Sequence, residues 1–130
     1  DFSGSKKLAD YLINEDLINK QNLITTYHSR STSAILPYIS NSSNLFYCLE
    51  YEDYCSYMVW NDVYDKTGNL SINEVMERIN RARESKMIDN IIFISDVEIE
   101  DLSFNSEYSL IESFNNTIVE SESSYIYKKD

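Results

Sequence analysis

The chain has 130 residues, a length that fits one domain, and its 11 basic and 22 acidic residues give a formal net charge of -11 at pH 7. Hydrophobic residues make up 42% and aromatic residues 13% of the sequence, which is enough to build a core and excludes a disordered acidic tail. No apolar run approaches the roughly 18 residues that span a bilayer, and binding a nucleic-acid backbone would need a basic face. We therefore expect a single cytoplasmic domain over residues 1–130 that contacts neither membrane nor nucleic acid directly.

Two apolar stripes near the N-terminus predict a helical hairpin over residues 5–29. Leu8, Leu12 and Ile13 recur at helical spacing in the first stripe. After a break at 14–16, a second stripe continues through Leu17, Ile18, Leu23, Ile24 and Tyr27. The next segment, 31–43, is uncharged and contains Pro37, so we expect a connector there.

The clearest strand pattern follows this connector. Residues alternate at 45–49 and at 54–60, and the polar stretch 50–53 between them predicts a β-hairpin. A four-residue loop would place Cys48 opposite Cys55. Two cysteines and one histidine are too few for a structural zinc site. We favour free thiols, because two cysteines do not mark a disulfide-rich secreted protein, and a disulfide closing the hairpin is the alternative.

The second half of the chain predicts two helices and two strands. A turn at 65–69 precedes Ser71, which caps a helix over 71–86, with Glu74 at the capping-box position. The apolar run 90–95 indicates a central strand buried on both faces. Spacing of apolar residues predicts a helix over 106–119, and 124–127 closes the chain as an edge strand. The fold class is therefore α+β, with a mixed sheet of about four strands within 44–127 and helices packed on one side.

The acidic residues concentrate in two segments. Residues 31–65 contain five acids and no base, and 91–130 contain nine acids and two bases. Tyrosines accompany both segments, and tyrosine is enriched at protein interfaces. Carboxylates also steer a protein toward basic surfaces. The residues that we predict to bind a partner are Glu50, Tyr51, Glu52, Asp53, Tyr54, Asp62, Asp65, Asp96, Glu98, Glu100 and Asp101. The plainer interpretation of each segment is a solvated face.

The sequence offers no convergent set of catalytic residues, so we do not expect an enzyme. His28 is the only imidazole, and no glycine-rich phosphate loop is present. The carboxylates at 96–101 follow a strand, and carboxylates at the end of a strand can bind magnesium or calcium. Their alternation with Val97 and Ile99, however, predicts a half-exposed strand, and no lysine occurs between 90 and 127. We expect no metal and no cofactor.

Charge and size together favour a non-catalytic inhibitor that occupies a basic surface on a nuclease or another nucleic-acid-binding protein. Anti-restriction and anti-CRISPR proteins of phages work in this way, as do immunity proteins of nuclease toxins; this is an analogy of class, not of family. The first alternative is a small domain or subunit of a larger assembly, whose acidic faces are merely solvated. The second alternative is an enzyme that uses carboxylates and a metal ion.

Overall fold

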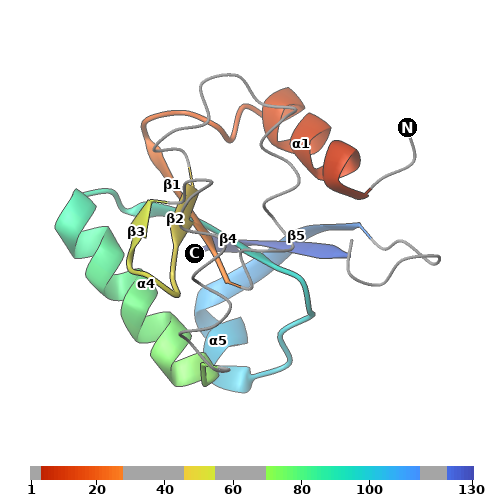
Figure 1. Ribbon diagram of the computed structural model, residues 1–130. Coiled ribbons are helices and arrows are strands. Elements are labelled where there is room, and N and C mark those ends of the chain that lie inside the picture. Colours follow the sequence, from red (N-terminus) through yellow and green to blue (C-terminus); the bar gives the residue numbers. More distant parts are fainter. Residues whose placement is uncertain (1–3, 28–45, 55–69, 115–122) are drawn as a thin grey trace.

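A six-stranded mixed sheet forms the centre of the protein (Figure 1). The structure is a computed structural model that describes residues 4–27, 46–54, 70–114 and 123–130. The strand order is β3-β2-β1-β4-β6-β5. The α+β class is confirmed, but the sheet is larger than the four strands expected from the sequence. Its strands are β1 (Asn22–Thr26), β2 (Phe46–Cys48), β3 (Asp53–Tyr54), β4 (Asn90–Ser95), β5 (Tyr108–Phe114) and β6 (Ser124–Lys129).

The expected N-terminal hairpin is half correct. Its first helix is present as α1 (Gly4–Asn14), whereas the region assigned to the second helix contains the strand β1. β1 lies between β2 and β4 and is parallel to both, so its backbone is paired on two sides. Leu23 and Ile24 then face different layers of the core. A helix needs one apolar face, whereas a central strand buries successive side chains on both faces, which explains the misassignment.

The prediction of a buried central strand at 90–95 is confirmed. β4 pairs in parallel with β1 and antiparallel with β6. Ile92 and Ile94 are each 1% exposed and share a cluster with residues of α1, while Phe93 is buried in the cluster on the opposite face. The hydroxyl of Thr25 in β1 donates a hydrogen bond to the Ile92 carbonyl oxygen at 3.1 Å, which satisfies a buried polar side chain.

Helices cover both faces of the sheet, which corrects the expectation that they pack on one side (Figure 1). On one face, α1 buries Leu8, Ala9 and Leu12. On the other face lie α4 (Ile72–Lys86) and α5 (Leu102–Glu107). A twisted sheet with three parallel central strands is apolar on both faces, and each face has to be shielded from water.

The prediction for α4 is confirmed at both ends. The Ser71 side chain accepts a hydrogen bond from the Glu74 backbone N–H at 3.2 Å, as an N-cap does. The helix continues to Lys86, as predicted. It stops at Met87, which adopts a left-handed conformation with φ of 56° and donates its backbone N–H to the last turn.

The C-terminal region differs from its prediction. The segment 108–114 is β5 rather than part of a helix, and it pairs antiparallel with β6. β6 is not an edge strand, because β4 flanks it on the other side and β5 forms the edge. A shift in register between Leu110 and Glu112 inserts one extra residue into β5. The extra residue breaks strict alternation, and the apolar spacing then imitates a helix.

Several predictions lie outside the described residues: the connector at 31–43, the turn at 65–69, His28, Asp62 and Asp65, and most of the second hairpin strand. Within the described ranges, every helix is too short or too polar to cross a bilayer.

Candidate protein-binding surface

The predicted hairpin is present in its described part, but in a different register. Cys48 pairs with Asp53, and Tyr47 pairs with Tyr54, so Cys48 does not lie opposite Cys55 in the ladder. The loop is Leu49–Glu52, one residue earlier at each end than expected. Its backbone closes tightly: the N–H groups of Tyr51 and Glu52 both donate to the Cys48 carbonyl oxygen, and Glu52 has a φ of 55°.

Cys48 is disulfide-bonded in the structure. The preference for free thiols is therefore wrong, and the alternative of a disulfide applies to Cys48. Cys55, the other cysteine of the sequence, lies outside the described residues.

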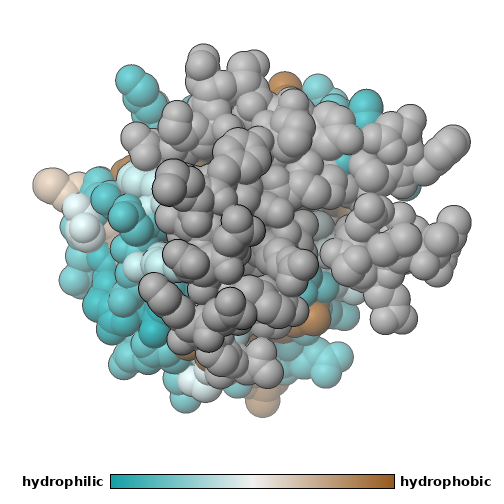
Figure 2. Space-filling model, viewed as in Figure 1, coloured by the Kyte–Doolittle hydropathy of each residue, from teal (hydrophilic) through white to brown (hydrophobic). Residues whose placement is uncertain are grey.

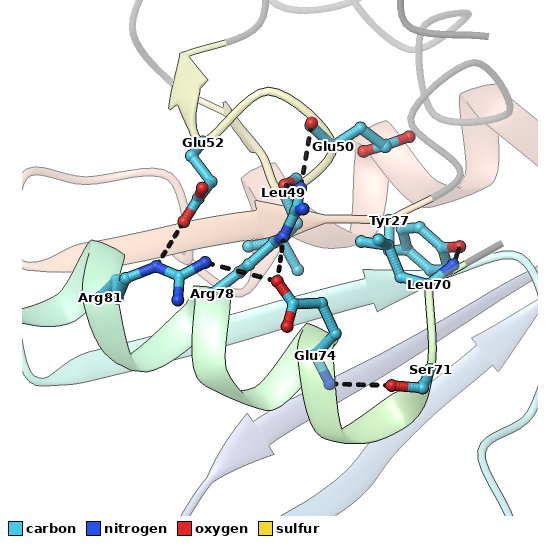
Figure 3. Close-up of polar contacts among 9 residues, drawn as sticks. All are labelled: Tyr27, Leu49, Glu50, Glu52, Leu70, Ser71, Glu74, Arg78 and Arg81. Atoms are coloured by element: carbon cyan, nitrogen blue, oxygen red, sulfur yellow. Dashed lines mark hydrogen bonds and ion pairs between the residues drawn. The ribbon is translucent and has the colours of Figure 1, made fainter. Parts of the chain in front are cut away.

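An arginine of α4 holds the hairpin loop by its backbone (Figure 3). Nη1 of Arg78 donates hydrogen bonds to the carbonyl oxygens of Leu49 and Glu50, at 2.9 and 3.1 Å. Nε of Arg78 bonds to Oε1 of Glu74 at 2.9 Å, and the arginine side chain is only 18% exposed. Leu49 and Glu50 are both buried, and the guanidinium satisfies their carbonyl oxygens and fixes the loop onto α4.

A second arginine of α4 pairs with an acid of the loop (Figure 3). Nε of Arg81 lies 2.7 Å from Oε1 of Glu52, and its Nη2 lies 3.5 Å from Oε1 of Glu74. The hydrogen bond to Glu52 raises the pKa of Arg81, and the hydrogen bond from Arg78 lowers the pKa of Glu74. These residues form a surface network in which each acid faces a guanidinium. We call Glu52, Glu74, Arg78 and Arg81 the hairpin network.

The remaining acids of the hairpin are also engaged or enclosed. Glu50 is only 7% exposed. Oδ1 of Asp53 accepts a hydrogen bond from the Tyr54 backbone N–H at 2.7 Å. The acid-rich hairpin loop is therefore not a free negative surface, although the sequence around it contains no base. Arg78 and Arg81 are not among the residues predicted from the sequence. Their spacing from Glu74 along α4, four and seven residues, is the signal that they share one helix face.

The two acidic segments of the sequence meet at one edge of the sheet. β1, β2 and β4 are parallel, so Tyr27, Glu50 and Asp96, which follow these strands, lie at the same carboxyl edge. The hydroxyl of Tyr27 accepts a hydrogen bond from the Leu70 backbone N–H. Burial raises the pKa of Tyr27, and the negative charges of Glu50 and Asp96 raise it further. The structure thus brings together segments that are about 45 residues apart in the chain.

The carboxylates at 96–101 lie in a loop between β4 and α5, not in the half-exposed strand that their alternation predicted. The Ser95 hydroxyl bonds to both backbone groups of Val97. The Ile99 N–H donates to the Tyr127 hydroxyl at 2.8 Å. Asp101 is the N-cap of α5, because its Oδ1 accepts a hydrogen bond from the Phe104 N–H at 3.0 Å. We call residues 96–102, which include Leu102 at the start of α5, the β4–α5 loop.

The β4–α5 loop presents uncompensated acids beside exposed apolar side chains. Glu98 and Glu100 are exposed, and neither takes part in an ion pair formed by the described residues. Val97 is 50% and Leu102 is 88% exposed. In Figure 2, the surface over α4 is largely hydrophilic, whereas isolated hydrophobic side chains appear along the lower rim, where Figure 1 places this loop and α5.

A metal site at these carboxylates finds no support among the described residues, where no three histidine, cysteine, aspartate or glutamate side chains come together to hold an ion. Glu98 and Glu100 point into solvent rather than toward a common centre with the Asp101 carboxylate, which is used as a helix cap.

In comparisons with known proteins, the chain matches no protein-family model, no curated protein and no solved structure.

Proposed function

We propose that the protein is a non-catalytic binding protein that occupies a basic surface on a protein partner, and that the β4–α5 loop is its principal contact. The observation that carries this proposal is the pairing of exposed, uncompensated Glu98 and Glu100 with exposed Val97 and Leu102. Carboxylates accelerate encounter with a basic surface, and apolar side chains then add area that is removed from water on contact.

The hairpin network has a secondary role in this proposal. Its acids are already paired with Arg78 and Arg81, so they contribute less to long-range attraction than their number in the sequence implies. It supports the loop Leu49–Glu52 at the same sheet edge as Asp96, which places the hairpin next to the contact without making it the source of the attraction.

The class of partner follows from charge. A chain with a net charge of -11 is repelled by nucleic acid and attracted by proteins that bind it, because those proteins carry basic clefts. Occupation of such a cleft by this protein would block access of nucleic acid, which is the mode of anti-restriction, anti-CRISPR and nuclease-immunity proteins. We therefore favour a nuclease or another nucleic-acid-binding protein as the partner.

The test compares two double variants of equal charge change. Glu98→Gln with Glu100→Gln neutralises the β4–α5 loop, whereas Glu84→Gln with Asp89→Asn neutralises two exposed acids near the opposite end of β4. Proteins retained by the immobilised wild-type chain are identified and purified. The rate at which each of them associates with each variant is then measured between about 0.05 and 0.5 M salt. This range spans strong and weak electrostatic attraction, because the Debye length is about 10 Å at 0.1 M.

We expect a one-to-one complex whose association slows with salt, and a several-fold slower association for the loop variant at low salt but not for the control variant. With a nuclease partner, wild-type protein should also suppress DNA cleavage stoichiometrically. Equal rates for the two variants would overturn the assignment of the loop. A retained partner without a basic surface, bound independently of salt, would instead favour a subunit of a larger assembly.

A further inference from the structure

An open hollow of about 320 Å³ lies on the other side of the molecule from the β4–α5 loop, at the amino end of β1. Its walls come from three separate segments: β1 with the connection that precedes it, the hairpin strand β3, and the connection between α4 and β4. The side chains used in the argument below are those of Ile18, Lys20, Leu23, Tyr54 and Ile88. This volume falls at the lower end of the range of small-molecule sites.

The first wall is held in place by side-chain hydrogen bonds. Asn19 donates to the Asp16 carbonyl oxygen at 2.8 Å, and its Oδ1 accepts the backbone N–H groups of Gln21 and Asn22. Asn22 donates from its side chain to the Leu17 carbonyl oxygen at 2.9 Å. The connection is therefore formed before any ligand arrives, so a ligand would not have to order it.

The opposite wall is fixed by the end of α4. The Ile88 N–H donates to the Arg83 carbonyl oxygen at 3.2 Å, which anchors Ile88 beside the hollow. Tyr54 offers an aromatic ring, and the Lys86 ammonium lies 4.7 Å from the centre of that ring. The hollow thus combines an aromatic side chain with aliphatic ones, a lining that suits a flat apolar group.

The charged residue among those that line the hollow is basic, although the protein as a whole is acidic. Lys20 lines the hollow and Lys86 lies over the Tyr54 ring, and neither lysine joins an ion pair formed by the described residues. The nearby carboxylate of Asp53 accepts a backbone hydrogen bond from Tyr54. In a chain with a net charge of -11, a lysine that lines the hollow and a second lysine over the ring of a lining tyrosine favour an anionic ligand.

We infer that this hollow binds a small organic anion with a flat apolar body, such as an aromatic carboxylate. The ring system would lie among Ile18, Leu23, Tyr54 and Ile88, and the carboxylate would accept hydrogen bonds from Lys20 at the rim. The site does not depend on the proposed contact at the β4–α5 loop.

The experiment uses 2-naphthoate as the probe and 2-naphthamide as a neutral probe of the same shape, each titrated into the ¹⁵N-labelled full chain and followed in two-dimensional amide spectra. We expect saturable shifts that centre on the amides of Ile18, Leu23 and Ile88. Lys20→Met should weaken naphthoate binding about tenfold and leave naphthamide binding unchanged, because only the charged hydrogen bond is lost.

Lys7→Met is the matched control, since Lys7 is an exposed lysine of α1 away from the hollow. Lys86→Met is a second variant, and it should also weaken naphthoate binding more than naphthamide binding. Shifts that do not saturate, or that centre elsewhere, would overturn the site. Equal affinity for the two probes, or equal loss in the Lys7 and Lys20 variants, would overturn its preference for an anion.

Discussion

The hairpin loop and the β4–α5 loop are alike in sequence and different in structure. Both are acidic segments without a neighbouring base, and both follow parallel strands at the same edge of the sheet. The hairpin loop lies against α4, where Arg78 and Arg81 pair with its carbonyl oxygens and with Glu52. Among the described residues, no base pairs with Glu98 or Glu100 of the β4–α5 loop, and both stay exposed.

The difference shows that local net charge is a poor guide to surface charge. Arg81 is 29 residues from Glu52 in the chain, so a search for base-free segments treats the acid as unpaired. The fold joins the two residues at 2.7 Å. An acidic segment becomes a candidate contact only when the fold also keeps basic helices away from it.

The largest expected effect comes from the core that both loops share. Ile92 is buried in β4, in a cluster that also contains Phe46 and Cys48 of β2. Ile92→Ala should lower the free energy of unfolding by about 2–5 kcal/mol, because it removes buried methyl groups and leaves a cavity. Chemical denaturation would measure the loss of unfolding free energy, and hydrogen exchange would show which amides lose protection.

Exchange should rise together for amides of the hairpin and of the β4–α5 side, since both rest on this cluster. If hairpin amides exchanged at unchanged rates while β4 amides became unprotected, the two regions would be separate folding units and the comparison would not hold. Val97→Ala, at a half-exposed loop position, is the control and should change stability little.

A pH titration distinguishes the hairpin from the β5 edge of the sheet by their tyrosines. Burial raises the pKa of Tyr108, beside α5, to about 12 from 10.0, and burial also raises the pKa of Tyr47 in the hairpin strand. The folded state therefore keeps the Tyr108 proton when the unfolded chain has lost it. The contribution of Tyr108 to stability is complete below pH 10 and is lost as pH rises from about 10 to about 12.

The expected loss is roughly 3 kcal/mol for two pKa units. Tyr108→Phe should remove most of this pH dependence, and Tyr47→Phe should remove less. Denaturation midpoints at pH 8, 10 and 11.5 provide the measurement. A Tyr108→Phe variant that loses stability above pH 10 as steeply as the wild type would show that the phenol is not buried in the folded state.

The smallest effect concerns the two arginines that distinguish the hairpin loop. Arg78→Met removes a largely buried guanidinium and leaves the carbonyls of Leu49 and Glu50 without their donor, so we expect a loss of about 1.5–3 kcal/mol. Arg81→Met removes a half-exposed ion pair, and its cost should be smaller.

Thermal unfolding of both variants at low and high salt would separate these contributions. The Arg81 variant should approach wild-type stability as salt rises, whereas the Arg78 variant should not, because hydrogen bonds at partly buried carbonyls are poorly screened. Equal losses for the two variants would mean that the hairpin is held by surface charge alone.

The sequence by itself determined the features that depend on neighbouring residues. The capping pattern at Ser71 and Glu74, the apolar stripe of α1 and the continuous apolar run of β4 each fix a local structure, and all three predictions are confirmed. The existence of a turn after Cys48 was predicted for the same reason. Short-range spacing encodes caps, helix faces and buried runs, because the contacts concerned lie within one element.

Only the tertiary structure decided what depends on distant partners. The sequence patterns of β1 and β5 predict helices. β1 is a strand because β2 and β4 pair with it on both sides, and β5 is a strand because β6 pairs with it in a bulged register. In the same way, the sequence predicts unpaired acids in the hairpin, whereas the fold places Arg78 and Arg81 of α4 beside them. Strand pairing and charge compensation join residues that are tens of positions apart in the chain. The sequence pattern around one residue therefore does not identify its distant partner.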